Sequence, residues 1–334
     1  MTIKDLPKVE LHSHLELCLR PSTIKELAPQ FGIELPDEKT FRERFLILEP
    51  MKDLGSVLNK FLDTQKLLGS PEILERIAFE ACEDAFQVSN IRVMEFRYAP
   101  TFIRLNHEHM SFEKIHESLL KGLQRAEKTY PMATGLICII QRILPVKEAE
   151  QVTDFAIENK DSFIGLDLAD NEVGFDSKPF SSFFARAKKA GLGITVHSGE
   201  ADVPNAPRYV REAIDYLGAD RIGHGVQIYR DPETIEYVKS KDITLELCPT
   251  SNWLTNAIPP NQVHPFRQLF EAGVNVTINT DDGGIFNVTL NEEYERVQKT
   301  HSMTIEELQK ITENAYRTSF IDEAKRAKVF PGKK

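Results

Sequence analysis

Short apolar runs alternate with longer amphipathic stretches along most of this chain. The short runs are rich in β-branched residues, as buried parallel strands are, whereas the longer stretches repeat apolar residues at helical spacing. Examples of the longer kind are Phe112–Lys128, Val146–Asn159, Phe180–Ala190 and Arg208–Leu217. The short runs predict eight strands: Lys8–Leu15, Ile91–Tyr98, Ala133–Gln141, Phe163–Ala169, Gly193–Ser198, Arg221–Val226, Ile243–Pro249 and Val274–Thr280.

Eight strand–helix units predict parallel strands joined by crossover helices, and this number favours a closed (β/α)8 TIM barrel. An open doubly wound sheet is the alternative, but no GxGxxG motif opens its first helix. Residues 32–89 hold more helices than one crossover needs, and a long insertion after a strand lies over the mouth of a barrel, so we expect a lid there. Residues 291–327 predict additional C-terminal helices. We expect residues 1–334 to form one domain.

Composition and charge limit the classes of function. The chain has 334 residues and a formal net charge of −10, which argues against binding of nucleic acid phosphates. No apolar run reaches the roughly 18 residues of a membrane span, and the N-terminus lacks the apolar core of a signal peptide. The four cysteines are far apart and predict reduced thiols in a cytoplasmic protein. We expect a small-molecule partner, no membrane and no nucleic acid, and we leave the oligomeric state open.

The few histidines gather at predicted strand ends. His12 and His14 lie two residues apart on the first strand, so both side chains face the same way. On its own, this pair fits two hydrogen-bonded core histidines as well as metal ligands. His197 and His224 follow the fifth and sixth strands, and Asp281 follows the eighth. Because barrel active sites form at the carboxyl ends of the strands, we predict an active site there.

Three imidazoles and one carboxylate from this set would suit Zn²⁺, with Fe, Co or Mn as alternatives. Such a metal lowers the pKa of water from 15.7 to about 7, which predicts hydrolysis at an electrophilic carbon or phosphorus. The fourth strand ends in Asp167-Leu168-Ala169-Asp170 rather than in a lysine that could bridge two metals, so we expect one ion. Glu200 could deliver a proton. Asp282 reaches the site only if the chain turns after Asp281, and Gly283-Gly284 make that turn easy.

Several of these motifs occur together in a known family. The sequence resembles adenosine deaminase and its close relatives in the amidohydrolase superfamily, which are metal-dependent hydrolases with a TIM barrel. The resemblance covers nearly the whole chain in the family's order. It is carried by Lys8–Leu15, Gly165–Glu172, His197–Glu200, Arg221–Gly225, Cys248–Asn252 and Asn279–Asp282.

The resemblance implies catalytic roles for the strand-end residues. His12, His14, His197 and Asp281 would hold one zinc ion. Glu200 would protonate purine N1. His224 would orient the attacking water and stabilise the developing charge together with Asp281.

The resemblance also implies contacts to the substrate. Asp282 would bind purine N7, the main-chain N–H of Asp170 would face N3, and His14 would border the substrate. Leu54–Phe61, including Leu58 and Phe61, would form an apolar lid over the purine. The implied reaction is hydrolysis of adenosine or 2′-deoxyadenosine to the inosine product and ammonia, within purine salvage and nucleotide metabolism.

This chain departs from the family pattern near the sugar. Glu16-Leu17 stand where Asp-Gly is usual, Asp170 replaces a glycine, and Gly283 replaces a proline. The Glu16 side chain is one carbon longer than the usual Asp, and its carboxylate would still reach a ribose 5′-hydroxyl. These departures keep 6-aminodeoxyfutalosine and free adenine open as alternative substrates for the same chemistry.

Two other classes of function remain as alternatives: a mononuclear metal hydrolase of amides or phosphoesters, and a binding protein that has kept the fold. The cytidine-type zinc deaminases are excluded, because no PCxxC motif follows His14-Leu15-Glu16.

Overall fold

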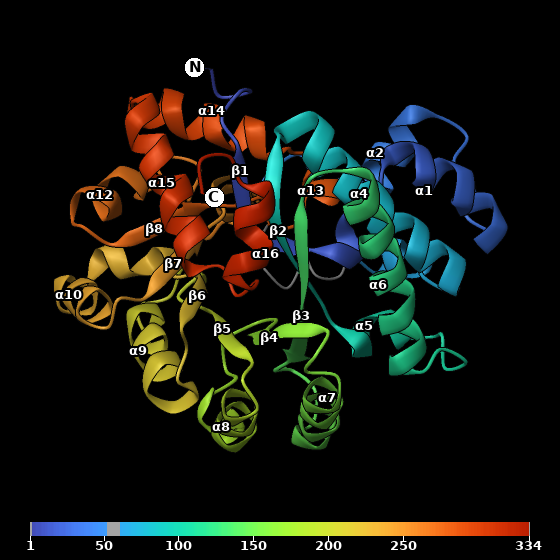
Figure 1. Ribbon diagram of the computed structural model, residues 1–334, viewed down its shortest axis with the longest axis horizontal. Helices are drawn as coiled ribbons and strands as arrows, with labels where there is room; N and C mark the ends of the chain where they lie inside the picture. Colours follow the sequence, from blue (N-terminus) through green and yellow to red (C-terminus); the bar gives the residue numbers. More distant parts are fainter. Residues whose placement is uncertain (1, 52–60, 334) are drawn as a thin grey trace.

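The computed structural model describes residues 2–51 and 61–333, and its strands form one parallel sheet in sequence order (Figure 1). Helices surround this sheet, so the predicted (β/α)8 TIM barrel is confirmed. The strands are β1 Lys8–His14, β2 Ile91–Tyr98, β3 Ala133–Gln141, β4 Phe163–Ala169, β5 Gly193–Ser198, β6 Arg221–His224, β7 Thr244–Leu247 and β8 Asn275–Ile278.

Main-chain hydrogen bonds between the end of β1 and the residues after β8 close the barrel. The N–H of His14 donates to the Asp281 carbonyl over 2.9 Å, and the N–H of Asp281 donates to the His12 carbonyl over 3.0 Å. Ser13 and Asp281 form an isolated parallel bridge. The contacts that close the barrel therefore also bring His12 and His14 beside Asp281, although more than 260 residues of chain separate them.

Helices fill the crossovers and both extra regions. The region after β1 contains η1 Leu15–Leu17, α1 Pro21–Leu27, η2 Ala28–Phe31, α2 Glu38–Phe45 and α4 Pro71–Ser89. The crossovers contain α5 Pro100–Arg104, α6 Phe112–Thr129, α7 Val146–Glu158, η3 Lys178–Phe180, α8 Ser181–Lys189, α9 Ala206–Leu217, η4 Val226–Arg230, α10 Pro232–Ser240, α11 Pro249–Leu254 and α12 Phe266–Glu271. The C-terminal part contains α13 Gly283–Phe286, α14 Leu290–His301, α15 Ile305–Thr318 and α16 Glu323–Val329.

The first predicted strand ends one residue too late and three others end two residues too late, and the backbone explains those three. β6 stops at His224, whose φ of 61° is left-handed and breaks the extended chain. β7 stops at Leu247 because Pro249 begins α11, where proline is well tolerated at the first helical position. β8 stops at Ile278, shortly before Asp281, which also has a positive φ of 62°. His224 and Asp281, the two residues with positive φ, both line the cavity at the barrel mouth.

Charged side chains cross the interior of the barrel and pair with one another. Arg97 donates to Asp167 over 2.8 Å and to Glu246 over 2.7 Å, and all three are fully buried. Arg221 donates to Glu246 over 2.6 Å and to Glu95 over 2.7 Å. This buried network, which we call the interior ion layer, lies below the residues at the mouth. Every charge in it has an opposite partner, as a buried charge requires.

The C-terminal helices pack on the outside of the first and last strands. α15 packs on β8 and β1, and α16 packs on β2 and β3 (Figure 1). Between them, the Ser319 hydroxyl donates to Glu95 over 2.6 Å, and the ring of Phe320 lies 3.6 Å from the Arg221 guanidinium. The C-terminal segment thus supports the interior ion layer. Among the described residues, no helix is both long and apolar enough to cross a bilayer.

Candidate active site

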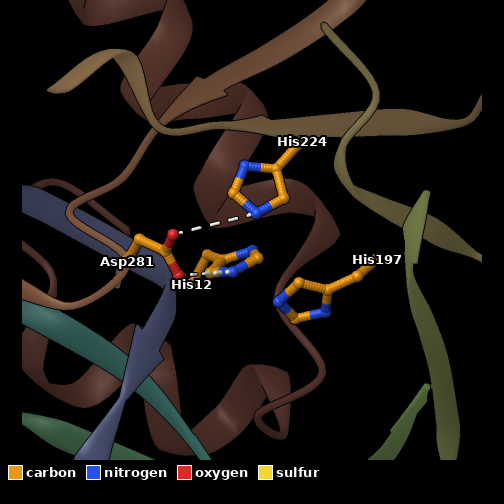
Figure 2. Close-up of side chains that lie close together, drawn as sticks. All are labelled: His12, His197, His224 and Asp281. Atoms are coloured by element: carbon orange, nitrogen blue, oxygen red, sulfur yellow. Dashed lines mark ion pairs between the residues drawn. The ribbon is translucent and has the colours of Figure 1, made fainter. Parts of the chain in front are cut away.

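Three imidazoles and one carboxylate meet at the carboxyl ends of the strands. Figure 2 shows the rings of His12, His197 and His224 pointing toward one another beside the Asp281 carboxylate. One nitrogen or oxygen from each of these four lies within 4.8 Å of the others, and all four residues are buried. His14 Nε2 also approaches this cluster, 3.2 Å from His197 Nε2 and 3.2 Å from Asp281 Oδ1. The side chains predicted from separate strand ends therefore do converge.

Carboxylates from the interior ion layer orient two of the imidazoles. His12 Nδ1 lies 2.8 Å from Glu246 Oε2, and His197 Nδ1 lies 3.0 Å from Asp167 Oδ2. A carboxylate only accepts hydrogen bonds when ionised, so each Nδ1 carries the proton and each Nε2 offers a lone pair. Burial lowers the pKa of His197 to about 4, which keeps the ring neutral. Neutral imidazoles with a carboxylate on the far nitrogen are typical of metal ligands.

Asp281 and Asp282 both reach the mouth because the chain turns between them. The positive φ of Asp281 sends its side chain toward the histidines, and Asp282 then caps α13. The Ser251 hydroxyl donates to Asp281 Oδ2 over 2.7 Å. Burial would raise the pKa of Asp281, but the neighbouring imidazoles of His12 and His14 hold it well below its usual value. Asp281 is therefore ionised.

Glu200 faces the same cluster, but its pKa is shifted in the opposite direction to that of Asp281. Its Oε2 lies 3.7 Å from His224 Nε2. Burial, and then the charge of Asp281, raise the pKa of Glu200 well above its ordinary value. The side chain therefore holds its proton to higher pH than an exposed glutamate does, which suits a general acid.

A second carboxylate fixes the loop that carries Glu200. Glu172 is buried and accepts main-chain N–H groups from three successive residues, Gly199, Glu200 and Ala201, over 2.7–2.8 Å. These charge-assisted bonds hold the backbone of Glu200 in one place.

A cavity of about 320 Å³ opens in front of the cluster. Its lining is mostly apolar and includes Leu17, Phe61 and Phe102, with Glu16 and Asp170 at its edge. Glu16 Oε1 accepts the N–H of Ala99 over 2.9 Å, whereas Oε2 is buried and has no hydrogen-bond partner in the part of the chain that the structure describes. Burial raises the pKa of Glu16 to about 8. Unpaired polar atoms that face a cavity are typical of a site that awaits a polar ligand.

Asp282 and Asp170 line the same cavity. Asp282 Oδ1 is buried and finds no hydrogen-bond partner within residues 2–51 and 61–333. Burial, followed by the charge of Asp281, raises the pKa of Asp282 well above its ordinary value. Asp170 has a positive φ of 81°, and its carboxylate accepts from Gln141 over 3.1 Å and from the N–H of Asn171 over 2.7 Å. The predicted Leu54–Phe61 lid lies outside the described residues except for Phe61, and Leu58 lies outside them as well.

Comparison with known proteins places the chain in one family. The family model for adenosine deaminase matches residues 7–332. The chain belongs to the adenosine deaminase family. An adenosine deaminase from Clostridium perfringens is 36% identical over 98% of both chains. One from Plasmodium falciparum is 33% identical over 96% of this chain and 87% of its own.

Solved structures of related proteins have the same barrel. An adenine deaminase from Arthrobacter aurescens superposes with a TM-score of 0.87, at 27% identity over 96% of both chains. An amidohydrolase from Burkholderia ambifaria with bound Zn has a TM-score of 0.86, at 27% identity over 97% of this chain and 88% of that chain. An Arabidopsis N6-mAMP deaminase has a TM-score of 0.84, at 29% identity over 98% of this chain and 97% of that chain.

Membership of the adenosine deaminase family makes this protein a purine deaminase, a hydrolase of a metal-dependent family. The relatives differ in the purine that their names give as substrate, so the family alone leaves the substrate open. The predicted reaction class and family are thus confirmed, whereas the individual site residues stay predictions.

Sequence reasoning missed the residues that orient the site. Asp167, Glu246 and Arg97 hold the ligand-bearing strands, and Glu172 and Asn252 contact the catalytic loops. One signal was available: Arg97, Asp167 and Glu246 are charged residues inside otherwise apolar strands. A charge in such a position requires a partner and points to a buried network.

Proposed function

We propose that this protein hydrolyses adenosine or 2′-deoxyadenosine to the inosine product and ammonia, with one zinc ion per chain. The observation that carries the proposal is the convergence of Glu200, Asp281 and the imidazoles at one cavity. Its volume of about 320 Å³ lies at the lower end of small-molecule sites, which span roughly 300–1,000 Å³.

The donor atoms fit a tetrahedral metal site. Bonds of about 2.0–2.1 Å to a tetrahedral Zn²⁺ put neighbouring ligand atoms roughly 3.3 Å apart. His14 Nε2 lies 3.2 Å from both His197 Nε2 and Asp281 Oδ1, and His12 Nε2 lies 3.1 Å from Asp281 Oδ1. His12, His14, His197 and Asp281 would therefore hold the ion. The zinc-bound Burkholderia relative supports zinc over Fe, Co or Mn. When bound, the metal supplies hydroxide near neutral pH by lowering the pKa of water.

The remaining side chains bind the purine and move protons. Glu200 donates its proton to N1, which makes C6 more electrophilic toward water. His224 and Asp281 stabilise the charge that develops as the C6 amino group leaves. Asp282, whose carboxyl group is protonated and unpaired, binds N7, and Asp170 and Phe61 border the ring.

The cavity favours an uncharged group at the sugar end. Among the described residues that line it, none is Lys or Arg, whereas Glu16 and Asp170 are acidic. A phosphate would meet no compensating charge from these residues, so we propose a nucleoside rather than a nucleotide. Free adenine is the second candidate. Leu17 adds an apolar side chain near the expected ribose, and an adenine deaminase is among the similar structures.

A substrate panel tests this proposal. Ammonia release would be measured with adenosine, 2′-deoxyadenosine, adenine, 6-aminodeoxyfutalosine and N6-methyl-AMP. We expect the highest kcat/KM with the two nucleosides and none with the nucleotide. Turnover of adenine alone, or of the futalosine compound alone, would overturn the adenosine assignment but not the chemistry.

One double variant near the expected sugar position adds to what the substrate panel can distinguish. The double variant Glu16→Asp with Leu17→Gly should change adenosine turnover less than twofold if the wild type already accepts the ribose. A large gain with adenosine would mean that the natural substrate carries a different group at N9.

Metal analysis tests the cofactor. Purified protein should contain about one zinc per chain, lose activity with a chelator and regain it with zinc. Cytoplasmic location and a role in purine salvage follow as part of the same proposal.

A further inference from the structure

Asn252 lies between two imidazoles, one of which belongs to the active site. Asn252 is fully buried at the start of α11. Its Nδ2 lies 3.1 Å from His224 Nδ1, and its Oδ1 lies 3.1 Å from His264 Nε2. The segment Cys248–Asn252 is one of the motifs that carry the family resemblance, yet no role in the proposed reaction uses Asn252.

An amide nitrogen only donates and an amide oxygen only accepts, so this contact dictates where the protons lie. His224 Nδ1 must accept from Asn252, which places the ring proton on Nε2. His264 Nε2 must donate to Asn252, which leaves its other nitrogen as an acceptor. His264 Nδ1 is indeed buried with no hydrogen-bond partner among the described residues.

The opposite orientation of the amide is less favourable at both ends. It would put the His264 proton on the unpartnered Nδ1, and buried N–H groups without a partner are rarer than unpartnered acceptors. It would also turn a lone pair of His224 Nε2 toward the ionised Asp281, whose Oδ2 lies 3.8 Å away. A lone pair facing an ionised carboxylate is repelled, whereas an N–H is attracted.

The partners of the other imidazoles provide the contrast within this site. His12 and His197 both place Nδ1 against a carboxylate, so their Nε2 atoms are free of protons. His224 places Nδ1 against an amide N–H instead. Its Nε2 therefore carries a proton and is unable to bind a metal.

We infer that Asn252 is a positioning residue that fixes the proton of His224 on Nε2, and so makes His224 a hydrogen-bond donor into the cavity instead of a metal ligand. This inference deepens the proposed function and rests on it for its consequence. The N–H then points at the space between Glu200 and Asp281, where water attacks and negative charge develops. Both His14 and His224 lie close enough to the cluster to be the third imidazole ligand. A proton on His224 Nε2 decides this choice in favour of His14.

The decisive experiment reads the protonated nitrogen directly. Long-range proton–nitrogen NMR of the zinc-loaded, ¹⁵N-histidine-labelled protein distinguishes a ring protonated at Nε2 from one protonated at Nδ1. The signals of His224 are assigned by their loss in His224→Gln. We expect His224 to be protonated at Nε2 in the wild type, and protonation at Nδ1 would overturn the inference whatever the activity.

Variants separate positioning from folding. In Asn252→Asp the new carboxylate accepts, so Nδ1 should gain a proton, and kcat should fall at least about tenfold with little change in KM. Asn256→Asp is the matched control four residues along, because the Asn256 amide contacts the main chain of Met51 and not His224. It should leave the His224 signals and kcat unchanged. An unchanged His224 spectrum in folded Asn252→Asp would contradict the inference.

Metal content gives a second, independent readout. His224→Ala should keep about one zinc per chain, whereas His197→Ala should lose it. Loss of zinc from His224→Ala would make His224 a ligand and overturn the inference. If His224 carries its proton on Nε2 but no purine is deaminated, only the proposed function fails.

Discussion

The barrel contains two groups of buried charge, and they differ in how completely they are paired. In the interior ion layer, Arg97 and Arg221 neutralise Asp167, Glu246 and Glu95 through bonds of 2.6–2.8 Å. At the mouth, where β1 and β8 end, Glu16 Oε2 and Asp282 Oδ1 have no hydrogen-bond partner among the described residues.

The pKa directions follow this difference. Although burial alone would raise them, the charges of Arg97 and Arg221 hold the pKa of Glu246 well below its ordinary value. Burial, followed by the charge of Asp281, raises the pKa of Glu200 and Asp282 well above theirs, and no described Lys or Arg forms an ion pair with either carboxyl group. Buried carboxyl groups therefore stay ionised where an arginine pairs with them and bind their protons more tightly where none does.

The largest effect is expected from removing the carboxyl proton of Glu200. In Glu200→Gln the amide resembles the protonated acid in shape and charge but has no proton to transfer. We expect kcat to fall about 10²- to 10⁴-fold while zinc content and the unfolding midpoint stay unchanged. Steady-state kinetics beside metal analysis and thermal unfolding would measure this. Turnover within threefold of wild type would remove Glu200 from the acid role.

Breaking the interior ion layer should lower the free energy of unfolding instead. Arg97→Gln leaves Asp167 and Glu246 with less compensating charge, so the free energy of unfolding should fall by about 3–5 kcal/mol. Urea unfolding measures it. Arg20→Gln is the control, because Arg20 pairs with Glu83 and Asp84 at the partly exposed surface and should lose at most about 1 kcal/mol. Equal losses in both variants would mean that the interior ion layer contributes no more to the free energy of unfolding than the surface ion pairs do.

A buried carboxyl group outside the mouth sharpens the comparison. Glu293 on α14 accepts the N–H of Thr250, its Oε2 has no partner, and burial raises its pKa from 4.5 to about 7. The folded protein thus holds this proton more tightly than the unfolded chain, so stability falls as pH rises from 4.5 through 7. Glu293→Gln should remove that fall and gain up to about 3 kcal/mol at pH 8, but nothing at pH 4.

Urea unfolding of wild type and Glu293→Gln at several pH values would check this sign. Parallel pH profiles of the two proteins would show that the buried group has little influence on stability.

The smallest effect is expected at Asp282. Asp282→Asn removes a carboxyl group that has no cationic partner among the described residues but keeps a hydrogen-bond donor for N7. We expect kcat/KM to fall about tenfold or less, since one neutral hydrogen bond is worth roughly 0.5–1.5 kcal/mol. Stability at pH 8 should stay equal or rise, because burying the charged form is costly. A loss of stability as large as that of Arg97→Gln would mean that Asp282 is ionised and paired, like the carboxylates of the interior ion layer.

Local patterns were enough for the fold and for much of the candidate site. Apolar runs and helical spacing predicted the eight strands and the crossover helices between them. Strand ends pointed to His12, His197, His224 and Asp281, which do converge. These predictions succeeded because strand direction and the barrel rule depend on periodicity that neighbouring residues already contain.

Only the tertiary structure decided what each of these side chains can do. The proton of an imidazole depends on the partner of its other nitrogen, and those partners come from distant strands: Glu246 for His12 and Asn252 for His224. The charge of Glu200 or Asp282 depends on burial and on the distance to a cation. Sequence determined which reactive groups gather at the mouth. Their protonation was set by long-range packing, because electrostatic energy depends on separation in space and not along the chain.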